Sequence, residues 1–504
     1  MPPNDIVPTL NAIDLLVIGG GINGVGVARD AAGRGLQVYL CEKDDLAQHT
    51  SSASTKLIHG GLRYLEFYDF KLVHHALQER EVLLRSAPHI IYPMRFILPH
   101  HKALRPKWMI RIGLFLYDHL GGRKMLPASH SVDLRRHIAG GMLKPVYKSG
   151  FEYSDCWVHD ARLVVLTAKD AEARGAVIAT HTRCLSLKRH TDHWSATLQN
   201  ERDGKTIEVK TKAVVNAAGP WVEEVLGLGV SADQTHGVRF VKGSHIVVPR
   251  LFEHDYPYIF QHTDGRVLFA IPFEENYTLL GTTDIELDEL PDEVAITPDE
   301  VEYICTAVSE YFKQPIHPES VIWSFSGVRP LYDDAVSNAS KVTRDYNLHL
   351  DSQQAPILSI YGGKITTFRK LAEEVMDLLS ECMAIEGAAW TAESHLPGGD
   401  MANSDFKLFF NQCTRRYPWM NKQLLKSYAG HYGTCIQTLL EESASEADLG
   451  IHFGGQLYEK EVRYLIDHEY AESADDILWR RTKRGLRLSA IEIKQFTAWL
   501  EGIK

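Results

Sequence analysis

The sequence LLVIGGGINGVGVARDAAGRGLQVYLCE, residues 15–42, decides the fold of this chain. It predicts a buried strand, a glycine turn, a helix and a second strand that ends at Glu42. Gly19 permits the tight turn, Gly21 lets the backbone approach a pyrophosphate, and Gly24 allows the helix to pack closely on the strand. The helix N-terminus would face the phosphates, and Glu42 would accept a hydrogen bond from a ribose hydroxyl. The chain is therefore predicted to bind a dinucleotide.

Composition narrows the class of protein. The chain has 504 residues, a length typical of about three domains, and 44% hydrophobic and 24% charged residues, as in globular proteins. A net charge of -11 argues against a nucleic-acid partner. The seven cysteines are scattered singly without metal-ligand spacing, which favours a reducing compartment and predicts no metal site. With no signal-peptide pattern and no run of ~20 apolar residues, we expect a cytoplasmic protein, free or resting on a membrane.

Periodicity predicts the organisation of the rest of the chain. Residues 69–85 have helical spacing of apolar side chains, and strand-like segments at 213–217, 245–248, 266–271 and 277–280 favour an inserted antiparallel sheet. A strand at 356–361 runs into a glycine turn and a helix that Thr366 opens. We expect a discontinuous nucleotide-binding domain (1–88, 150–228 and 350–395), a substrate domain (89–149 and 229–349) and a helical C-terminal domain (401–504).

Three further segments bear on which dinucleotide binds. TSSASTKLIHGG (50–61) places hydroxyls where a second phosphate and a ring would lie, VVNAAGPW (214–221) is a strand that ends in a glycine turn, and GGKITT (362–367) precedes a helix. The dipole of that helix would stabilise negative charge on a reduced flavin. Taken singly, they equally fit a surface loop, an ordinary strand-turn and a capped helix. Together they favour FAD over a nicotinamide cofactor.

The chain also resembles a known family. The stretches SSASTKLIHGGLRYLE, GFEYSDCWVHDARLV, VNAAGPWV, LLGTTD, SGVRPLYDD, GGKITTFRKLAE and DDILWRRTKRG, with the glycine turn, are similar to those of FAD-dependent glycerol-3-phosphate dehydrogenases, above all the aerobic, membrane-associated bacterial ones. The resemblance spans residues 19–485. It implies an α/β fold: a doubly wound FAD-binding domain like those of glutathione reductase and D-amino-acid oxidase, an antiparallel substrate domain, and a C-terminal all-helical cap.

Cofactor contacts are expected from the glycine turn, the hydroxyl-rich segment and the two later turns. The residues are Gly19, Gly21, Ile22, Asn23, Gly24, Glu42, Thr50, Ser51, Ser52, Ser54, Lys56, Leu57, His59, Gly60, Gly61, Ala218, Gly219, Trp221, Gly363, Lys364, Ile365 and Thr366.

The implied reaction is oxidation of sn-glycerol 3-phosphate to dihydroxyacetone phosphate, with hydride passing from C2 to FAD N5. A planar guanidinium suits the phosphate because it binds two oxygens and keeps its charge. The resemblance implies that Arg63, Tyr64, Arg329, Arg344 and Lys364 line the substrate pocket. Considered alone, each arginine also fits a solvated or ion-paired surface residue.

The proton of the C2 hydroxyl needs an acceptor. Histidine is the usual one because its ordinary pKa lies near working pH. His245, in the KGSH segment of the substrate domain, is our first candidate and His59 the second, and Arg329 can instead polarise the hydroxyl as hydride leaves.

Residues 100–117 combine a basic cluster with an apolar, aromatic run. In a helix, Trp108, Ile112, Phe115 and Leu116 share one face, while Arg105, Lys107 and Arg111 can reach lipid headgroups. The pattern also fits a core helix with basic flanks. The resemblance implies a peripheral protein of the cytoplasmic face of the inner membrane that binds anionic lipid and passes electrons to ubiquinone, feeding respiration. The basic cluster at 479–484 either adds to this surface or packs the cap, and a homodimer is compatible with the sequence.

Three alternatives stay open. An amine or amino-acid oxidase of the same architecture would need a carboxylate clamp and would release hydrogen peroxide. A glycerol-3-phosphate oxidase would use the same substrate with oxygen as acceptor. A non-catalytic, membrane-docked flavoprotein would not be reduced by any polyol phosphate.

Overall fold

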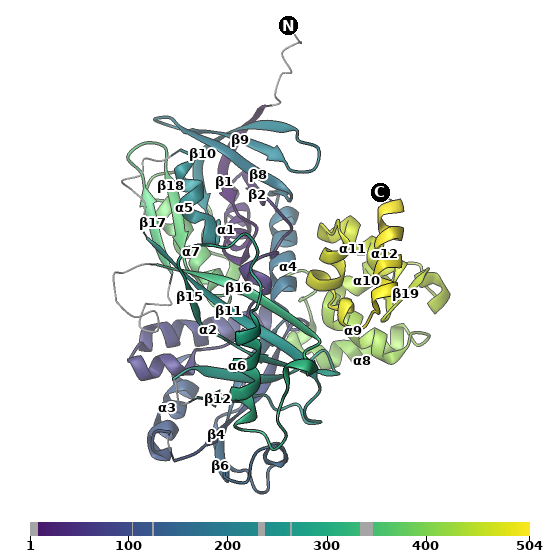
Figure 1. The fold of residues 1–504 in the computed structure, drawn as a ribbon. Coiled ribbons are helices and arrows are strands. Elements are labelled where there is room, and N and C mark those ends of the chain that lie inside the picture. Colours follow the sequence, from purple (N-terminus) through teal and green to yellow (C-terminus); the bar gives the residue numbers. More distant parts are fainter. Residues whose placement is uncertain are drawn as a thin grey trace.

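The computed structural model describes residues 9–102, 104–122, 125–229, 237–262, 265–332 and 346–503. Figure 1 shows three parts: a sheet with helices near the N-terminus, a second sheet below it, and a helical domain that ends at the C-terminus. This is the expected doubly wound α/β domain with a second sheet domain and a C-terminal helical domain.

The first sheet is built around parallel strands in the order β17-β18-β10-β1-β2-β7. The glycine-turn strand β1 lies between β2 and β10 and runs parallel to both. A β8–β9 hairpin extends β10, and β17 is antiparallel to β18. The strands are β1 (Thr9–Ile18), β2 (Val38–Cys41), β7 (Val177–Ala179), β8 (Thr182–Arg189), β9 (Trp194–Asn200), β10 (Thr206–Asn216), β17 (Asn347–Asp351) and β18 (Ile357–Tyr361).

Both faces of this sheet are buried, as alternation along β1 requires. Leu15 and Val17 pack into one core with the helices α1 (Ile22–Gly33), α4 (Asp160–Ala173) and α7 (Phe368–Leu379). Leu16 and Ile18 point to the other face and pack with α5 (Val222–Gly227) and the β8–β9 hairpin. Because successive side chains of a strand alternate between faces, a strand buried on both sides is apolar throughout.

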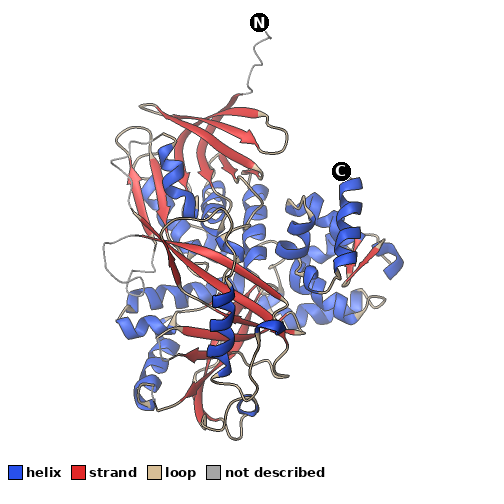
Figure 2. Cartoon of the chain, viewed as in Figure 1, coloured by secondary structure: helices blue, strands red, loops and turns tan. Residues whose placement is uncertain are grey.

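The second sheet has the order β15-β11-β14-β13-β12-β4-β6-β3, with β16 paired to β11 and β5 to β6. Its strands, red in Figure 2, are mostly antiparallel. They are β3 (Leu57–Ile58), β4 (Ile91–His100), β5 (His130–Asp133), β6 (Ser149–Val158), β11 (Val238–Pro249), β12 (Tyr258–Gln261), β13 (Val267–Phe273), β14 (Tyr277–Gly281), β15 (Ile285–Leu287) and β16 (Trp323–Tyr332).

Strand pairing shifts the expected domain boundaries. The sequence places residue 150 at the start of a nucleotide-binding piece, but β6 pairs with β4 from Ser149 to Val158 and so lies in the second sheet. The short strand β3 joins the same sheet through Leu57 and Ile58. Conversely, β17 begins at Asn347, before the expected boundary at 350, and belongs to the first sheet.

Three helices flank the second sheet. α6 (Pro298–Ser309) packs on one face, and α2 (Phe70–Ser86) and α3 (Lys107–Leu120) lie on the other. α2 agrees with the helix expected at 69–85, and the side chain of Asp69 caps it by accepting a hydrogen bond from Leu72 N. Among the described helices, none combines the length and the apolar character needed to cross a bilayer.

The C-terminal domain has a hydrophobic core of its own. It is helical as expected, apart from a short pair of strands, β19 (His452–Gly454) with β20 (Leu457–Tyr458). Its helices are α8 (Phe406–Arg416), α9 (Lys422–Tyr432), α10 (Ile436–Leu439), α11 (Glu459–Glu469) and α12 (Ala490–Gly502), with a π-helical turn at Asp476–Arg481.

Buried ion pairs join this domain to the first one. Asp45, which is fully buried, accepts hydrogen bonds from Arg480 Nε at 2.6 Å and from Arg481 at 2.6 and 2.7 Å. Arg162 of α4 pairs in the same way with Glu469 of α11. The basic cluster at 479–484, for which the sequence left two roles open, therefore packs the cap against the nucleotide-binding domain.

We expect Arg481→Met to destabilise the protein strongly, because it leaves the Asp45 carboxylate buried with two of its three arginine hydrogen bonds lost. Breaking a buried ion pair typically costs about 3–5 kcal/mol. Guanidinium-induced unfolding of the holoprotein should therefore begin at a clearly lower denaturant concentration.

Arg463→Met is the matched control, because Arg463 pairs with Glu459 in the same domain with 54% of its side chain exposed. An exposed pair contributes about 1 kcal/mol or less. Equal effects of the two substitutions would show that the Asp45 contacts do not hold the domains together.

Candidate active site

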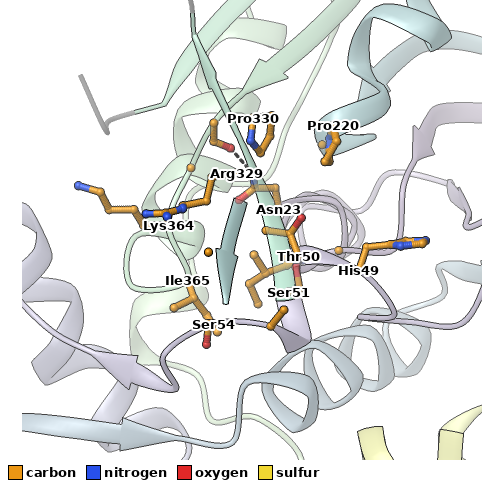
Figure 3. A pocket seen from close by; sticks show the side chains of 18 of the residues that line it. Asn23, His49, Thr50, Ser51, Ser54, Pro220, Arg329, Pro330, Lys364 and Ile365 are labelled. Atoms are coloured by element: carbon orange, nitrogen blue, oxygen red, sulfur yellow. Dashed lines mark hydrogen bonds between the residues drawn. The ribbon is translucent and has the colours of Figure 1, made fainter. Parts of the chain in front are cut away.

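A cavity of about 440 Å³ lies where the two sheets meet. Its walls come from the glycine turn after β1, the segment 47–57, the turn after β10 and the segment before α7. Strands β11, β13 and β16 of the second sheet close it. Figure 3 shows lining side chains from the start of α1, the segment 49–54, the turn after β10, β16 and the segment before α7.

The glycine turn has the geometry that a phosphate-binding turn needs. Gly19 adopts φ +115°, a conformation that favours glycine. A Cβ on Gly24 would lie 1.9 Å from the carbonyl oxygen of Gly19, so only glycine lets α1 sit this close to β1. Gly21 caps α1 without a side chain, and Ile22 N donates to Ser51 Oγ at 3.0 Å. The N-terminus of α1 therefore faces the cavity.

The end of β2 forms another part of the wall. Glu42 accepts hydrogen bonds from Gly20 N at 2.6 Å and Asp44 N at 2.9 Å, and burial raises the pKa of its carboxyl. Trp221, from the turn after β10, lies against the same region, with Lys43 Nζ 3.6 Å from its ring centroid. This end offers an acidic side chain and an aromatic surface, as a nucleoside requires.

The hydroxyl-rich segment is tied to the second sheet. Thr50 Oγ1 donates to the carbonyl oxygen of Val328 in β16 at 2.7 Å. A Cβ on Gly327 would lie 2.7 Å from Ala53 Cβ, so the glycine of the SGVRPL stretch makes room for this segment. The two domains therefore form the cavity together.

The first turn of α1 and the segment before α7 each bring a buried polar atom without a hydrogen-bond partner among the described residues. They are Asn23 Oδ1 and Lys364 Nζ. Asn23 Nδ2 donates to Gly362 O at 3.0 Å, and the ammonium of Lys364 lies 4.2 Å from the ring centroid of Tyr64. A buried ammonium without a hydrogen bond is costly, so this arrangement fits an anionic ligand.

His245 lies in β11 and is buried at the cavity wall. Its Nε2 is 3.0 Å from Thr55 Oγ1, its ring stacks on Phe325, and its Nδ1 is buried without a hydrogen-bond partner among the described residues. Burial, and then the charges of Lys56 and Arg329, lower the pKa of His245 to about 3. The sequence argument assumed a pKa near working pH, and the structure contradicts that assumption for this histidine.

Most of the expected site residues line this cavity. The cofactor candidates that do so are Gly19, Gly21, Ile22, Asn23, Glu42, Thr50, Ser51, Ser54, Leu57, His59, Gly61, Ala218, Gly219, Trp221, Gly363, Lys364, Ile365 and Thr366. The substrate candidates Arg63, Tyr64 and Arg329 and the proton acceptor candidate His245 also line it. Arg344 lies outside the described residues.

Four expected cofactor residues do not line the cavity, because each has a structural contact elsewhere. Gly24 packs on the Gly19 carbonyl, and Ser52 Oγ donates to His49 O at 3.3 Å. The ammonium of Lys56 is fully buried between the two carboxylate oxygens of Asp160, at 2.9 and 2.8 Å. Gly60 N donates to Tyr117 Oη at 2.8 Å.

Sequence reasoning missed several polar residues at the cavity, among them Gln261, Arg266 and Asp284. Asp284 ends the LLGTTD stretch that resembles the family, so a signal was present. Gln261 and Arg266 flank the turn between β12 and β13, where only pairing of these strands brings them to the cavity.

Two family descriptions match this chain. "FAD dependent oxidoreductase" matches residues 14–368, and "C-terminal domain of alpha-glycerophosphate oxidase" matches residues 389–502. Together they cover the two sheet domains and the helical cap.

Similar proteins cover almost the whole chain. The D-erythritol 1-phosphate dehydrogenase of Brucella abortus is 50% identical, with 97% of each chain covered. The aerobic glycerol-3-phosphate dehydrogenase of Escherichia coli is 47% identical, with 97% of each covered. The structure of glycerol-3-phosphate dehydrogenase from Bacillus halodurans complexed with FAD matches with a TM-score of 0.76 at 26% identity, covering 98% of this chain and 94% of that one.

The geometry predicts that Gly24→Ala removes the cofactor. A methyl group 1.9 Å from the Gly19 carbonyl oxygen would push α1 away from β1 and open the turn. We expect the purified variant to contain little FAD. The ratio of flavin absorbance at about 450 nm to protein absorbance should fall by about an order of magnitude.

Gly430→Ala is the control, because this helical glycine of α9 has open space around an added Cβ. Alanine is the better helix former by about 1 kcal/mol, so this variant should keep its FAD. Normal FAD content in Gly24→Ala would contradict the assignment of the turn as the phosphate-binding turn.

Proposed function

We propose that this chain, which belongs to the family of FAD-dependent glycerol-3-phosphate dehydrogenases, oxidises sn-glycerol 3-phosphate to dihydroxyacetone phosphate. The observation that carries the proposal is the buried ammonium of Lys364, which lines the cavity and has no hydrogen-bond partner among the described residues. FAD, when bound, supplies the hydride acceptor for C2. The protein has to bind the phosphate, orient C2 and accept one proton.

Lys364 and Arg63 are the groups we assign to the phosphate. Both line the cavity, and Tyr64 lies under the Lys364 ammonium. A phosphate dianion would give Lys364 the hydrogen bonds that it lacks, so binding recovers free energy lost by burying the charge. A neutral polyol such as glycerol offers no such compensation.

His245 is the group we assign to the proton of the C2 hydroxyl. Its pKa of about 3 keeps the imidazole neutral, and the unpartnered Nδ1 has a lone pair available in the tautomer that carries its proton on Nε2, toward Thr55 Oγ1. A nearby dianion favours the charged imidazolium and would raise this pKa when the phosphate binds. Arg329 would polarise the same hydroxyl, and His59 remains the second acceptor because it lines the cavity.

A second substrate has specific support. The D-erythritol 1-phosphate dehydrogenase of Brucella abortus is as similar to this chain as the glycerol 3-phosphate enzymes are, at 50% identity. Its substrate has the same phosphate and vicinal hydroxyls with one more carbon. Phosphate binding by Lys364 and Arg63 would serve both compounds, and direct comparison of the two decides between them.

The electron acceptor we propose is ubiquinone, reached from the membrane surface. The helix α3 exposes Trp108 by 63%, Ile112 by 52% and Phe115 by 53%, while Leu114 and Tyr117 are buried on its other face. Exposed Lys107 stands at its start. An amphipathic helix with exposed aromatics and basic flanks suits the interface of an anionic bilayer, where a quinone is confined.

Anaerobic reduction tests the reaction. Glycerol 3-phosphate should bleach the flavin absorbance of the purified protein, whereas glycerol and glycine should not. In Lys364→Met, kcat/KM for glycerol 3-phosphate should fall by about 30-fold or more, since losing a buried charge partner costs about 2 kcal/mol or more.

Lys370→Met is the matched control, because Lys370 lies in α7 directly after the segment that carries Lys364 and pairs with Glu373, and neither Lys370 nor Glu373 lines the cavity. Bleaching by glycine instead would indicate an amine oxidase, and no bleaching by any polyol phosphate would indicate a non-catalytic flavoprotein.

Vesicle binding tests the membrane surface. Ile112→Asp with Phe115→Asp should weaken sedimentation with anionic phospholipid vesicles at least about 10-fold, since each apolar side chain contributes about 1.5–3 kcal/mol on burial. In this double variant, the rate of quinone reduction should fall more than the rate at which a soluble dye is reduced. Ile491→Asp, at a more exposed site of the cap (71% exposed), should change neither vesicle binding nor quinone reduction. Peroxide release by the wild-type protein at the rate of substrate oxidation would favour oxygen as acceptor.

A further inference from the structure

A carboxylate faces Arg329 at the cavity. Asp284 Oδ1 accepts a hydrogen bond from Arg329 Nη2 at 2.7 Å, and the two side chains are 30% and 31% exposed. Both line the cavity, so the exposed part of each is available to a ligand there. Neither the proposed phosphate contacts nor the proposed proton acceptor uses Asp284.

Hydrogen bonds of the neighbouring Thr283 fix the turn that carries Asp284. Thr283 Oγ1 donates to Glu300 at 2.7 Å and accepts from Ser244 N at 2.9 Å. Glu300 is buried and also accepts from Ser244 Oγ at 2.8 Å and pairs with Lys242 at 2.9 Å. Burial alone would raise the pKa of Glu300, but these hydrogen bonds lower it, so the network stays charged. Asp284 is therefore preorganised.

A glycine makes room for the pair. A Cβ on Gly243 would lie 2.9 Å from both Arg329 Nη2 and Thr282 Oγ1. The absence of a side chain at this position of β11 lets the guanidinium cross the strand and reach the turn of Asp284. The KGSH stretch thus contributes Gly243 as well as His245, two residues further along.

The other carboxylates that line the cavity among the described residues have different positions. Glu42 is bonded to the glycine turn, and Asp155 accepts from Arg80 and Tyr117, both at 2.7 Å. Glu224 is exposed in the first turn of α5. Asp284 is the carboxylate that stands beside Arg329.

The Arg329–Asp284 pair differs from Lys364 in net charge, so the two sites suit different parts of a ligand. The Asp284 carboxylate largely offsets the charge of Arg329, so the pair attracts a phosphate dianion less than the Lys364 ammonium does. An arginine beside a carboxylate instead presents N–H donors and an oxygen acceptor side by side. Two vicinal hydroxyls, of which one accepts and the other donates a hydrogen bond, fit that arrangement.

We propose that Asp284 is a specificity-determining residue. It accepts a hydrogen bond from the hydroxyl on the carbon adjacent to the one being oxidised, while Arg329 donates a hydrogen bond to the oxygen on the carbon being oxidised. The inference rests on the proposed function and narrows its substrates to phosphates with a vicinal diol. It applies equally to glycerol 3-phosphate and to the four-carbon polyol phosphate, since both have this pair of hydroxyls.

The test compares two substrates of the holoenzyme. Propane-1,2-diol 1-phosphate, of matching configuration at C2, keeps the phosphate and the C2 hydroxyl of glycerol 3-phosphate and lacks only the terminal hydroxyl. Wild-type kcat/KM should favour glycerol 3-phosphate by about 10- to 100-fold, as a hydrogen bond to a charged group implies. In Asp284→Ala this preference should fall toward unity, with Asp284→Asn between the two.

Glu286→Gln is the matched control, because Glu286 lies two residues further along and its side chain is 54% exposed. It should keep the wild-type preference. If Asp284→Ala lowered kcat/KM for both substrates equally and left the preference unchanged, Asp284 would only position Arg329. That result would overturn the inference. If the variants lose FAD, the wild-type comparison decides alone: equal oxidation of both compounds overturns it. A wild-type protein that neither compound bleaches would overturn the proposed function itself.

Discussion

The contact between Gly24 of α1 and the carbonyl oxygen of Gly19 is the constraint on which the cofactor site depends. Because no side chain separates the helix from the strand, α1 begins close to the end of β1, and Gly21, Ile22 and Asn23 at its start line the cavity. The same closeness fixes Asn23 against the backbone of Gly362, on a segment more than 300 residues away in the chain. One short contact thus positions both the phosphate-binding turn and the turn that carries Lys364.

The cavity exists only because the second sheet meets the first. Glycines at adjacent strands of that sheet make the meeting possible: Gly327 accommodates the hydroxyl-rich segment, and Gly243 accommodates Arg329. The result is a wall with different chemistry at different places. The wall holds a buried ammonium at Lys364, a neutral imidazole at His245 and the Arg329–Asp284 pair, to which we assign different parts of the proposed polyol phosphate.

The helical cap is tied to the cofactor site through charge. Asp45 lies shortly after β2, which ends at Cys41, and the residues after it reach the cavity wall. Because Arg480 and Arg481 of the cap supply its hydrogen bonds, the cap also fixes the loop beside the glycine turn. The helix α3, with its exposed apolar face, lies on a different part of the molecule, below α2 in Figure 1. It takes no part in the contacts of Asp45 with the cap.

The sequence by itself determined the elements whose signals are local, which are the strand-turn-helix around Gly19, Gly21 and Gly24 and the helix that follows Asp69. It also favoured FAD, the cofactor of the matching family, through the segments 50–61, 214–221 and 362–367 taken together. Only the tertiary structure decided which side chains reach the cavity. Lys56 stands in a cofactor-like segment, yet Asp160 draws its ammonium into the protein. Asp284 meets Arg329 only when β11, β14 and β16 pair. The physical reason is that strand pairing and burial depend on residues far apart in the sequence, and these two factors decide where a side chain points and how its pKa shifts. Residue spacing along the chain is local and decides only whether a segment forms a helix or a strand.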